Sequence, residues 1–521
     1  MSDRTFSDPN GEGASPRARY LKQRTRFNTP SPCPLPRFAG GEGVQSGDIL
    51  SLRGYGSSVS ASSPSLYEGT TTPAEREAAY ERFVWKNLKR NYAGHFLHGM
   101  LGMTGFRLVN APTFVPAWLH MLSGGSDVAV GLGLALQQLG GTLSPIVGAA
   151  QIEHRKHVLP VSMFLGTMMR VWILGLGLIG WFLHGTTLLV TAMVFLFLLG
   201  LFSGPQGVAF QFLLGKMIPI AWRGRLQGWR NMIGGLIAAL LSYFAGKYIV
   251  GTNLWGNGYG TTFLAAFVLT SLGLTAFRLL VREPEPPSLR PRVNFRERVR
   301  DFVPMLRDNP PFLYFMIARS FAIASRVAAP FYIIYASKTV GMSGATIGAL
   351  SFAYLIADTV ANLAWGTMAD RLGFRSCFIA ALVFWIGATL VLMNVHTLPL
   401  FIVAFFGLGA ANSGYQMSAQ NIVFEFGHRD DMAMRLALSN TAESIMSALG
   451  PLAGGLIATA FGYHAVFGTS IGFEAVALVL LLTLVEEPRK KRLALEAEKM
   501  EALAETSTTS LAQREGEEYS D

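Results

Sequence analysis

Long apolar segments alternate with short polar ones along most of the chain. Residues 190–204 and 475–485, for example, are apolar on every face that a helix would present. Such a helix is buried in protein or in lipid, and crossing the hydrocarbon core takes about 20 residues of this kind. The pattern predicts an all-α membrane protein with twelve transmembrane helices, at residues 93–120, 127–150, 158–183, 187–214, 226–250, 261–281, 309–337, 345–367, 375–394, 398–424, 433–459 and 464–486.

Polar segments flank and divide these helices. Residues 1–70 are rich in Ser, Pro, Gly and Arg without periodicity, which is typical of a disordered tail. The expected organisation is therefore this tail, a short helix at 71–92, an N-terminal bundle at 93–281, a linker at 282–308, a C-terminal bundle at 309–486 and a second tail at 487–521.

The helix at 71–92 has a clear start signal. Thr72 is the expected cap, Pro73 the first helical residue, and Glu75 completes a capping box. An apolar face opposite basic residues favours an amphipathic helix at the membrane interface, although an ordinary solvated helix fits the same pattern.

The distribution of basic residues predicts the orientation. They gather before the first helix, in every second loop, in the linker and at 489–492, whereas the opposite loops carry only Lys338, with Lys247 at a helix end. The positive-inside rule places both termini in the cytoplasm. The net charge of +10 is then explained by topology and the lipid bilayer, without nucleic acid as a partner.

Composition excludes several kinds of chemistry. Half of the residues are hydrophobic and only 15% are charged, and two cysteines make a disulfide framework or a thiolate metal site a poor explanation. The sequence lacks the glycine-rich phosphate loop with its Lys-Ser/Thr end, so ATP is not expected to drive the protein directly. We expect no cofactor, no metal site and no enzymatic activity.

Residues recur at similar spacing in the two halves. An offset of 218 residues aligns Pro112 with Pro330 and brings Arg107 within one residue of Arg326. An offset of 210 aligns Gln206 with Gln416. Such duplication is common in transporters, and it predicts two pseudo-symmetric six-helix bundles.

A charged turn interrupts the apolar pattern after the eighth helix. The sequence "GTMADRLGFR" resembles the loop signature of the major facilitator superfamily, and its matching residues are Gly366, Asp370, Arg371, Gly373 and Arg375. The N-terminal counterpart at 148–156 keeps the glycine and basic residues but has its acid displaced by one place. The resemblance implies a monomeric secondary transporter with alternating access in a bacterial inner membrane.

In that superfamily this loop faces the start of the fifth helix, and the resemblance implies a cytoplasmic gate. Asp370 would accept hydrogen bonds from the free amides there, next to Arg223 and Arg225. The gate must break when the protein opens inward. The alternative is a helix-ending turn whose arginines only set topology.

Two acids fall inside predicted membrane helices, where ionisable groups are costly and usually functional. Asp358 lies about 12 Å from Gly366 along the eighth helix, with Asn362 one turn away on the same face. Glu443 lies mid-span in the eleventh helix. Both are candidates for proton coupling; the alternative is a permanent ion pair with a neighbouring arginine.

Three arginines are the corresponding cations. Arg107, with Asn110 nearby, lies in the first helix, and Arg319 and Arg326 share a face of the seventh. The resemblance implies that these helices line the solute cavity. Guanidinium groups bind carboxylate or phosphate bidentately, which suggests an anionic solute; the alternative is that the arginines only pair with Asp358 and Glu443.

Amide side chains complete the candidate site. Asn412, Gln416 and Gln420 form a stripe at helical spacing on the tenth helix, and Gln206 is the repeat partner of Gln416. Such a stripe faces a cavity or another helix. The function we expect is proton-coupled transport of a small organic solute. The alternatives are a drug or metabolite exporter working by proton antiport, and a membrane sensor or enzyme that has lost transport.

Overall fold

The computed structural model of the protein describes residues 72–110, 112–152, 155–286, 302–426 and 432–485. The chain divides into two units, Met1–Ser63 and Pro64–Asp521, and every described residue belongs to the second. The predictions for the tails at 1–70 and 487–521, and for residues 287–301 of the linker, fall outside the described residues.

The first described helix, α2 (Pro73–Lys86), begins where the sequence predicts. Thr72 Oγ1 accepts a hydrogen bond from the Glu75 amide at 3.2 Å, and Glu75 Oε2 accepts one from the Thr72 amide at 3.0 Å, so the capping box is confirmed. The Tyr80 hydroxyl donates to the Lys216 carbonyl at 2.6 Å. Burial raises the pKa of Tyr80, which keeps this hydroxyl protonated as a donor.

The N-terminal bundle contains the first six predicted spans, with boundaries shifted by a few residues. Its elements are α3 (Leu88–Asn110), α4 (Phe114–Leu122), α5 (Asp127–Ile152), α6 (Leu159–Phe182), α7 (Gly185–Met217), α8 (Ile220–Phe244), the π-helical turn η1 (Ala245–Val250), the 3-10 turn η2 (Leu254–Gly256) and α9 (Gly258–Leu280).

The C-terminal bundle contains the other six, preceded by the short helix α11 (Phe302–Asp308). Its elements are α12 (Pro310–Ala324), η3 (Ser325–Ala328), α13 (Ala329–Val340), α14 (Gly344–Leu372), α15 (Phe374–Asn394), α16 (Leu398–Asn421), η4 (Ile422–Glu425), α17 (Met432–Phe461) and α18 (Tyr463–Thr483). Within the described residues, ten helices are long and apolar enough to cross a membrane. The predicted all-α, twelve-helix membrane fold is confirmed.

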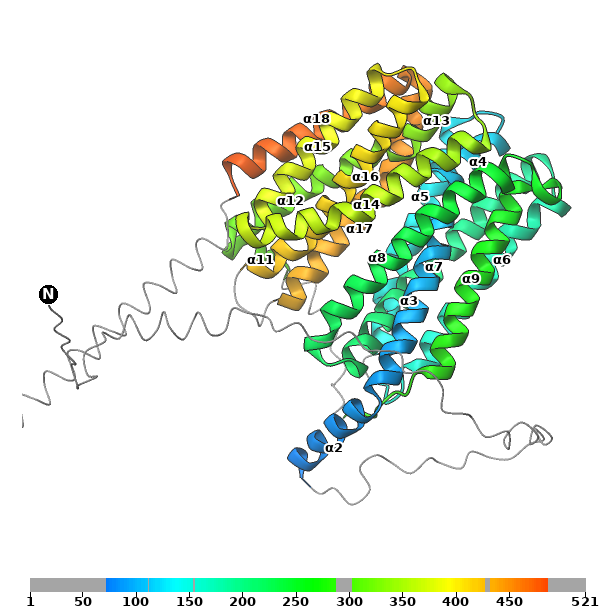
Figure 1. The fold of residues 1–521 in the computed structure, drawn as a ribbon. Coiled ribbons are helices and arrows are strands. Elements are labelled where there is room, and N and C mark those ends of the chain that lie inside the picture. The colour runs from blue at the N-terminus through cyan, green and yellow to red at the C-terminus, as the bar shows by residue number, and fades with distance from the viewer. Residues whose placement is uncertain (1–71, 111, 153–154, 287–301, 427–431, 486–521) are drawn as a thin grey trace, which may run out of the picture. The chain divides into compact units, whose positions relative to one another are not determined.

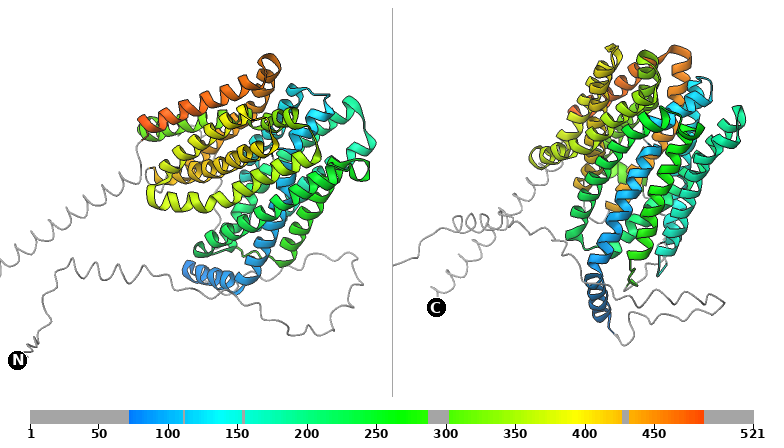
Figure 2. Two further views of the ribbon diagram at one scale, coloured as in Figure 1. Left: turned by 45° about the horizontal axis from the view of Figure 1, so that its top comes forward. Right: turned by 45° about the vertical axis from the view of Figure 1, so that its right-hand side comes forward.

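Packing within the two bundles follows one pattern, as the repeat predicts (Figures 1 and 2). In the first, α3 packs on α8 and α9, α7 on α5 and α6, and α6 on α9. In the second, α12 packs on α17 and α18, α16 on α14 and α15, and α15 on α18. Between the bundles, α5 packs on α17 and α8 on α14, which is again a symmetric pair of contacts.

The first and seventh spans are interrupted, which the sequence analysis did not predict. The first span divides into α3 and α4, with Thr113 in a non-helical conformation before α4. The seventh passes through the 3-10 turn η3 between α12 and α13. At each interruption an arginine lies a few residues before a proline, Arg107 before Pro112 and Arg326 before Pro330. Interrupted helices at membrane depth are typical of binding sites in transporters.

The helical bundles have two ends, the linker end and the far end. The linker end is where α9 ends at Leu280 and α12 begins at Pro310. The far end carries the turns between α4 and α5 and between α13 and α14. Here the bundles touch backbone to backbone, because a Cβ atom at Gly246 would fall 2.4 Å from the Gly348 Cα atom. Only glycine permits this approach.

Candidate functional site

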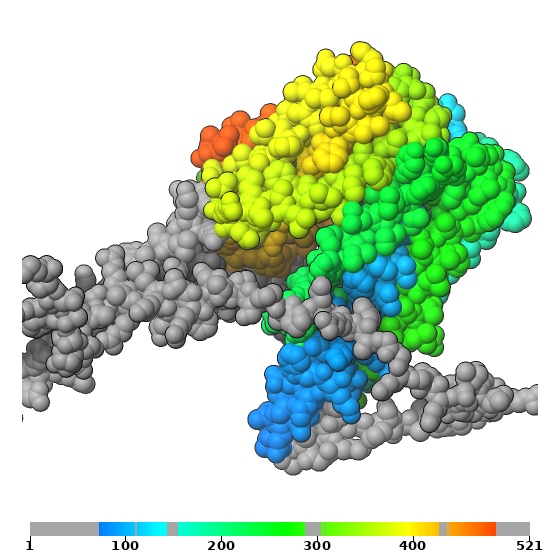
Figure 3. All heavy atoms as spheres, in the orientation of Figure 1, coloured from blue at the N-terminus to red at the C-terminus, as the bar shows by residue number. Residues whose placement is uncertain are grey.

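A cavity of about 970 Å³ lies between the two bundles. Along α16 its lining runs from half-buried Asn412 and Gln416 to exposed Gln420, so the cavity opens toward the linker end. Its other end is closed by buried apolar residues, including Val115 and Pro330. Figure 3 shows the face along which α8 and α14 meet beside it.

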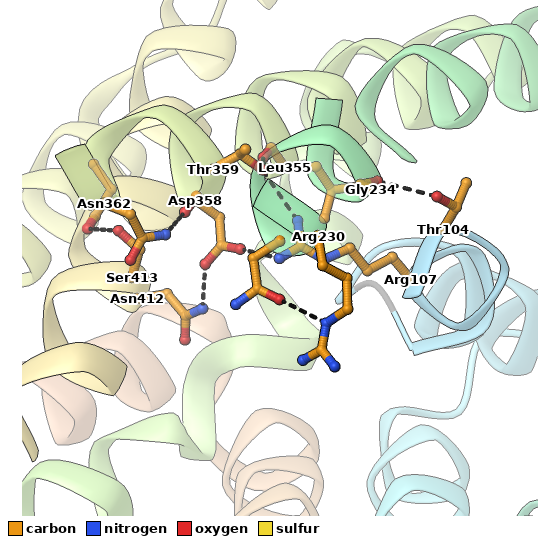
Figure 4. A network of polar contacts seen from close by, with 12 residues as sticks. Thr104, Arg107, Arg230, Gly234, Leu355, Asp358, Thr359, Asn362, Asn412 and Ser413 are labelled. Atoms are coloured by element: carbon orange, nitrogen blue, oxygen red, sulfur yellow. Dashed lines mark hydrogen bonds and ion pairs between the residues drawn. The ribbon is translucent and has the colours of Figure 1, made fainter. Parts of the chain in front are cut away.

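Asp358 lies at the centre of a polar network in this cavity (Figure 4). Its Oδ2 atom accepts a hydrogen bond from Arg107 Nη2 at 2.9 Å, and its Oδ1 atom accepts one from Asn412 Nδ2 at 2.8 Å. The side chains of Arg107 and Asp358 are 21% and 13% exposed. Since Arg107 is on α3 and Asp358 on α14, this ion pair joins the bundles across the cavity.

Further hydrogen bonds hold the pair in place. Arg107 Nη1 donates to Thr359 Oγ1 at 3.2 Å. Asn362 Nδ2 donates to the Asp358 carbonyl at 2.6 Å, one helical turn along α14. Both carboxylate oxygens of Asp358 therefore accept from donors, an arrangement that suits its ionised form.

Arg326 has a different environment in the same cavity. Its Nη2 atom donates to Asn412 Oδ1 at 2.7 Å. Its guanidinium carbon lies 5.2 Å from the ring centre of Tyr415 and 5.9 Å from that of Trp385. These are cation–π distances. Arg326 forms no ion pair with a carboxylate of the described residues.

Amide side chains make up much of the remaining polar lining. The predicted residues Asn412, Gln416 and Gln420 all line the cavity. The sequence analysis missed Gln137, Gln138, Gln227 and Asn231, which line it from α5 and α8. The available signals were the adjacent pair Gln137 and Gln138 in an apolar span, and Gln227 and Asn231, which lie four residues apart near a helix start.

Three predicted site residues with described side chains, Arg319, Glu443 and Gln206, are not part of the cavity lining. Arg319 is buried and donates to Ser439 and to the carboxylate of Glu443. Arg319 and Glu443 therefore form an ion pair, which is the alternative given for these residues in the sequence analysis. Gln206 is buried inside the N-terminal bundle, where its Oε1 atom accepts from Ser162 at 3.3 Å. The prediction for Asn110 falls on a side chain outside the described part.

The charged turn after α14 has the expected backbone. Gly373 ends the helix with φ of 88°, a left-handed conformation that favours glycine. Among the described residues, no atom outside α14's own backbone lies within 4 Å of a Cβ atom built on Gly366, so none of the described helices approaches it closely. Arg375 donates to the Leu481 carbonyl at the end of α18. Asp370 and Arg371 are exposed.

The arginines at the start of α8 are engaged locally. Arg223 donates to the carbonyls of Gly215 and Ile218 at the end of α7. The guanidinium of Arg225 lies 5.6 Å from the ring centre of Trp222. The countercharge that both arginines are expected to supply to Asp370 stays a prediction.

At the far end a second polar cluster joins the bundles. The Tyr463 hydroxyl lies 2.9 Å from both carboxylate oxygens of Asp127, and it accepts a hydrogen bond from Lys338 Nζ at 2.5 Å. His120 Nδ1 lies 3.5 Å from Asp127 Oδ1. Asp127 and His120 belong to the N-terminal bundle, and Lys338 and Tyr463 to the C-terminal one, so the cluster closes the far end.

Comparisons with known proteins agree with this geometry. Residues 315–514 match the sequence model of the Major Facilitator Superfamily. No curated protein sequence matches the chain. Among solved structures, a mutant of the nucleoside transporter NupG superposes with a TM-score of 0.60 at 11% identity, over 76% of this chain and 99% of that chain.

Two further structures have the same fold. A second NupG structure gives a TM-score of 0.57 at 12% identity, over 76% of this chain and 97% of that chain. The D-xylose-proton symporter gives 0.57 at 12% identity, over 77% and 98%. The C-terminal half thus matches the sequence model of the Major Facilitator Superfamily, and both halves together have the fold of these solved transporters.

Proposed function

We propose that the chain is a secondary active transporter that moves a small organic solute by alternating access and couples this movement to protons. The observation that carries the proposal is the cavity between the bundles, closed at the far end and crossed at mid-depth by the Arg107–Asp358 pair. Structural neighbours that carry nucleosides, or D-xylose with protons, support the class of function.

The linker end faces the cytoplasm in this proposal, because basic residues gather there. The structure then corresponds to the inward-open state of a bacterial inner-membrane protein. The cavity is complete within one chain, which supports a monomer as the working unit.

Asp358 is the proposed proton-coupling residue. The charged or titratable groups that line the cavity around it are Arg107 on α3, Arg326 on η3 and Tyr354 one turn earlier on α14. Protonation removes the charge that holds Arg107 across the cavity. Protonation thereby weakens the ion pair that connects the two bundles, which must move relative to one another during transport.

The test is transport by purified protein in proteoliposomes. The solute is first found by comparing metabolites of cells with and without the gene. Wild-type protein should exchange it in counterflow and accumulate it under a proton gradient. Asp358→Asn should keep counterflow but lose accumulation, whereas Glu77→Gln, an exposed acid on α2, should behave as wild type.

Each alternative has its own outcome in this assay. Absence of counterflow by folded protein would favour a sensor or enzyme on the transporter fold. Solute export driven by inward proton movement would favour an antiporter. Full accumulation by Asp358→Asn would remove Asp358 from the coupling mechanism.

A far-end variant tests alternating access itself. Tyr463→Phe removes the hydroxyl that connects Asp127 with Lys338, and the inward-open state should lose stability relative to the outward-open one. Cysteine labelling at positions near the far end should rise several-fold, on the scale of a lost charge-assisted hydrogen bond of about 1.5 kcal/mol. Unchanged labelling would show that the cluster does not close the far end.

A further inference from the structure

The electrostatics of the cavity identify a kind of solute. Among the described residues that line it, three are charged: Arg107, Arg326 and Asp358. Arg107 and Asp358 neutralise each other as an ion pair. Arg326 therefore leaves the empty cavity with one uncompensated positive charge.

The other nearby candidate for countercharge is already engaged. Glu443 is paired with Arg319, and neither of these side chains lines the cavity. Arg326 is held instead by the neutral partners Asn412, Tyr415 and Trp385. Contacts with neutral groups orient a guanidinium but leave its charge unbalanced, and an unbalanced charge at membrane depth is costly.

An anionic group on the solute would balance this charge. Arg326 uses one of its five N–H donors on Asn412, and the planar guanidinium is suited to binding a carboxylate through two parallel hydrogen bonds. One unbalanced charge matches a carboxylate, which carries one negative charge at neutral pH. It matches a phosphate monoester less well, because that group carries nearly two.

The rest of the lining is suited to hydroxyl groups. Gln138, Gln227, Gln416 and Gln420 line the cavity, and none of their side-chain amides has a hydrogen-bond partner among the described residues. Each primary amide offers donors and an acceptor, so it satisfies a hydroxyl that needs both. Apolar lining such as Phe106 and Val109 is also present, which accommodates a carbon skeleton.

We propose that the solute is a hydroxyl-bearing organic monoanion whose carboxylate binds Arg326 and whose hydroxyls bind the amides nearer the linker end. This inference rests on the proposed transport function and specifies its substrate class. The first and seventh helices then have separate tasks: Arg107 holds the proton-coupling acid, and Arg326 holds the solute.

Asn412 connects the two tasks. It donates to Asp358 and accepts from Arg326, and this orientation is the one that an ionised acid and a guanidinium require. A carboxylate on Arg326 competes for that guanidinium and frees the Asn412 oxygen. The amide can then turn its oxygen toward Asp358, which requires a proton on Asp358. Anion and proton therefore bind together, and by linkage each raises the affinity for the other.

The test uses purified full-length protein in detergent and measures thermal unfolding with added solutes. The probes are hydroxy acids of three to seven carbons, including D-gluconate and D-glucuronate. Their matched neutral, cationic and dianionic partners are D-glucuronamide and D-glucose, D-glucosamine, and D-glucose 6-phosphate. At least one hydroxy acid should raise the unfolding temperature saturably, and its amide partner should not.

Variants assign the effect to Arg326. Arg326→Lys should weaken the effective acid by at least about tenfold, since an ammonium group lacks the planar fork. Arg307→Lys, an exposed residue outside the cavity, should not change the affinity. If Arg326→Lys fails to fold, the comparison of a hydroxy acid with its neutral amide on wild-type protein still tests whether a carboxylate is required.

The outcomes separate this inference from the proposed function. Saturable stabilisation by neutral, cationic or dianionic solutes alone, or by none of the hydroxy acids, overturns the monoanion. Counterflow of a neutral solute would do the same while leaving the transport function intact. Binding of a hydroxy acid without counterflow would support the ligand class and overturn the transport function.

Discussion

The interrupted first and seventh helices are repeat copies of one element, and they differ in what their arginines bind. In each, an arginine lies a few residues before a proline at the interruption. Arg107 reaches across the cavity to Asp358 of the other bundle. Arg326 stays within its own bundle, against Asn412 and two aromatic rings. The two copies share a backbone arrangement, while the position of a single acid gives the two arginines different partners.

Packing explains why that acid occurs in only one bundle. The residue that corresponds to Asp358 at the 218-residue offset is Gly140 on α5. A Cβ atom there would lie 2.3 Å from the Phe197 carbonyl oxygen on α7. The N-terminal bundle therefore has a close backbone contact where the C-terminal bundle has the Asp358–Asn412 hydrogen bond, and it has no space for a carboxylate.

The largest expected effect concerns the buried pair on the other face of the seventh helix. Glu443→Gln leaves the Arg319 guanidinium buried without its acid, and this should cost about 3 kcal/mol of unfolding free energy. The folded fraction should still accumulate solute under a proton gradient, since Glu443 lies outside the cavity lining. Chemical unfolding and transport per folded molecule measure the two effects. Loss of coupling at normal stability would return Glu443 to the mechanism.

The next effect separates the two cavity arginines by stability. Arg107→Gln leaves Asp358 partly buried without its cation, and this should cost about 1–3 kcal/mol. The double variant Arg107→Gln/Asp358→Asn should recover most of that loss, because no charge is left unpaired. Arg326→Gln leaves no carboxylate unpaired, so it should change the free energy of unfolding by less than about 1 kcal/mol. Equal losses for both single variants would contradict the comparison.

Hydrophobic patterning was enough to predict the fold but not its interruptions. Twelve long apolar segments and two near-equal repeat offsets specify the number of helices and their pairing into two bundles. The divisions near Pro112 and Pro330 escaped notice, because proline is tolerated inside membrane helices and then gives no unique signal. Only the packed structure shows that both interruptions lie at the cavity.

The candidate site was predictable by residue type but not by partner. Polar side chains in apolar helices must face a cavity or another helix, so Asp358, Asn412, Gln416 and both cavity arginines could be named. Which acid pairs with which arginine depends on helix rotation and depth, and a sequence does not specify these. For this reason Arg319 and Gln206 were grouped with the cavity residues, although the structure buries them elsewhere.

A smaller effect tests the same difference while keeping the charge. Arg107→Lys preserves an ion pair with Asp358, so solute affinity should stay within about threefold of wild type. Proton-driven accumulation should also persist. Equilibrium binding and accumulation measure both quantities, with Arg326→Lys as the contrasting variant. A loss of affinity at Arg107 as large as at Arg326 would mean that both arginines bind the solute.

The smallest expected effect concerns the prolines that follow the two arginines. Pro330 has no N–H, and the Arg326 carbonyl accepts instead from the Ala329 amide in the 3-10 turn. Pro330→Ala supplies the missing donor, so η3 should widen into continuous α-helix and turn Arg326 away from Asn412. Solute affinity should fall about two- to threefold, with a stability change below about 1 kcal/mol.

Pro112→Ala is the matched variant in the first helix, and it should have no comparable effect. The interruption there is also held by Thr113, whose non-helical backbone is fixed by a 2.6 Å hydrogen bond from the Ser351 hydroxyl to its side chain. Adding one donor at residue 112 therefore cannot restore a continuous helix. Binding titrations on both variants compare the two interruptions directly. A larger loss of affinity for Pro112→Ala than for Pro330→Ala would assign solute recognition to the first helix and reverse the roles of the two arginines.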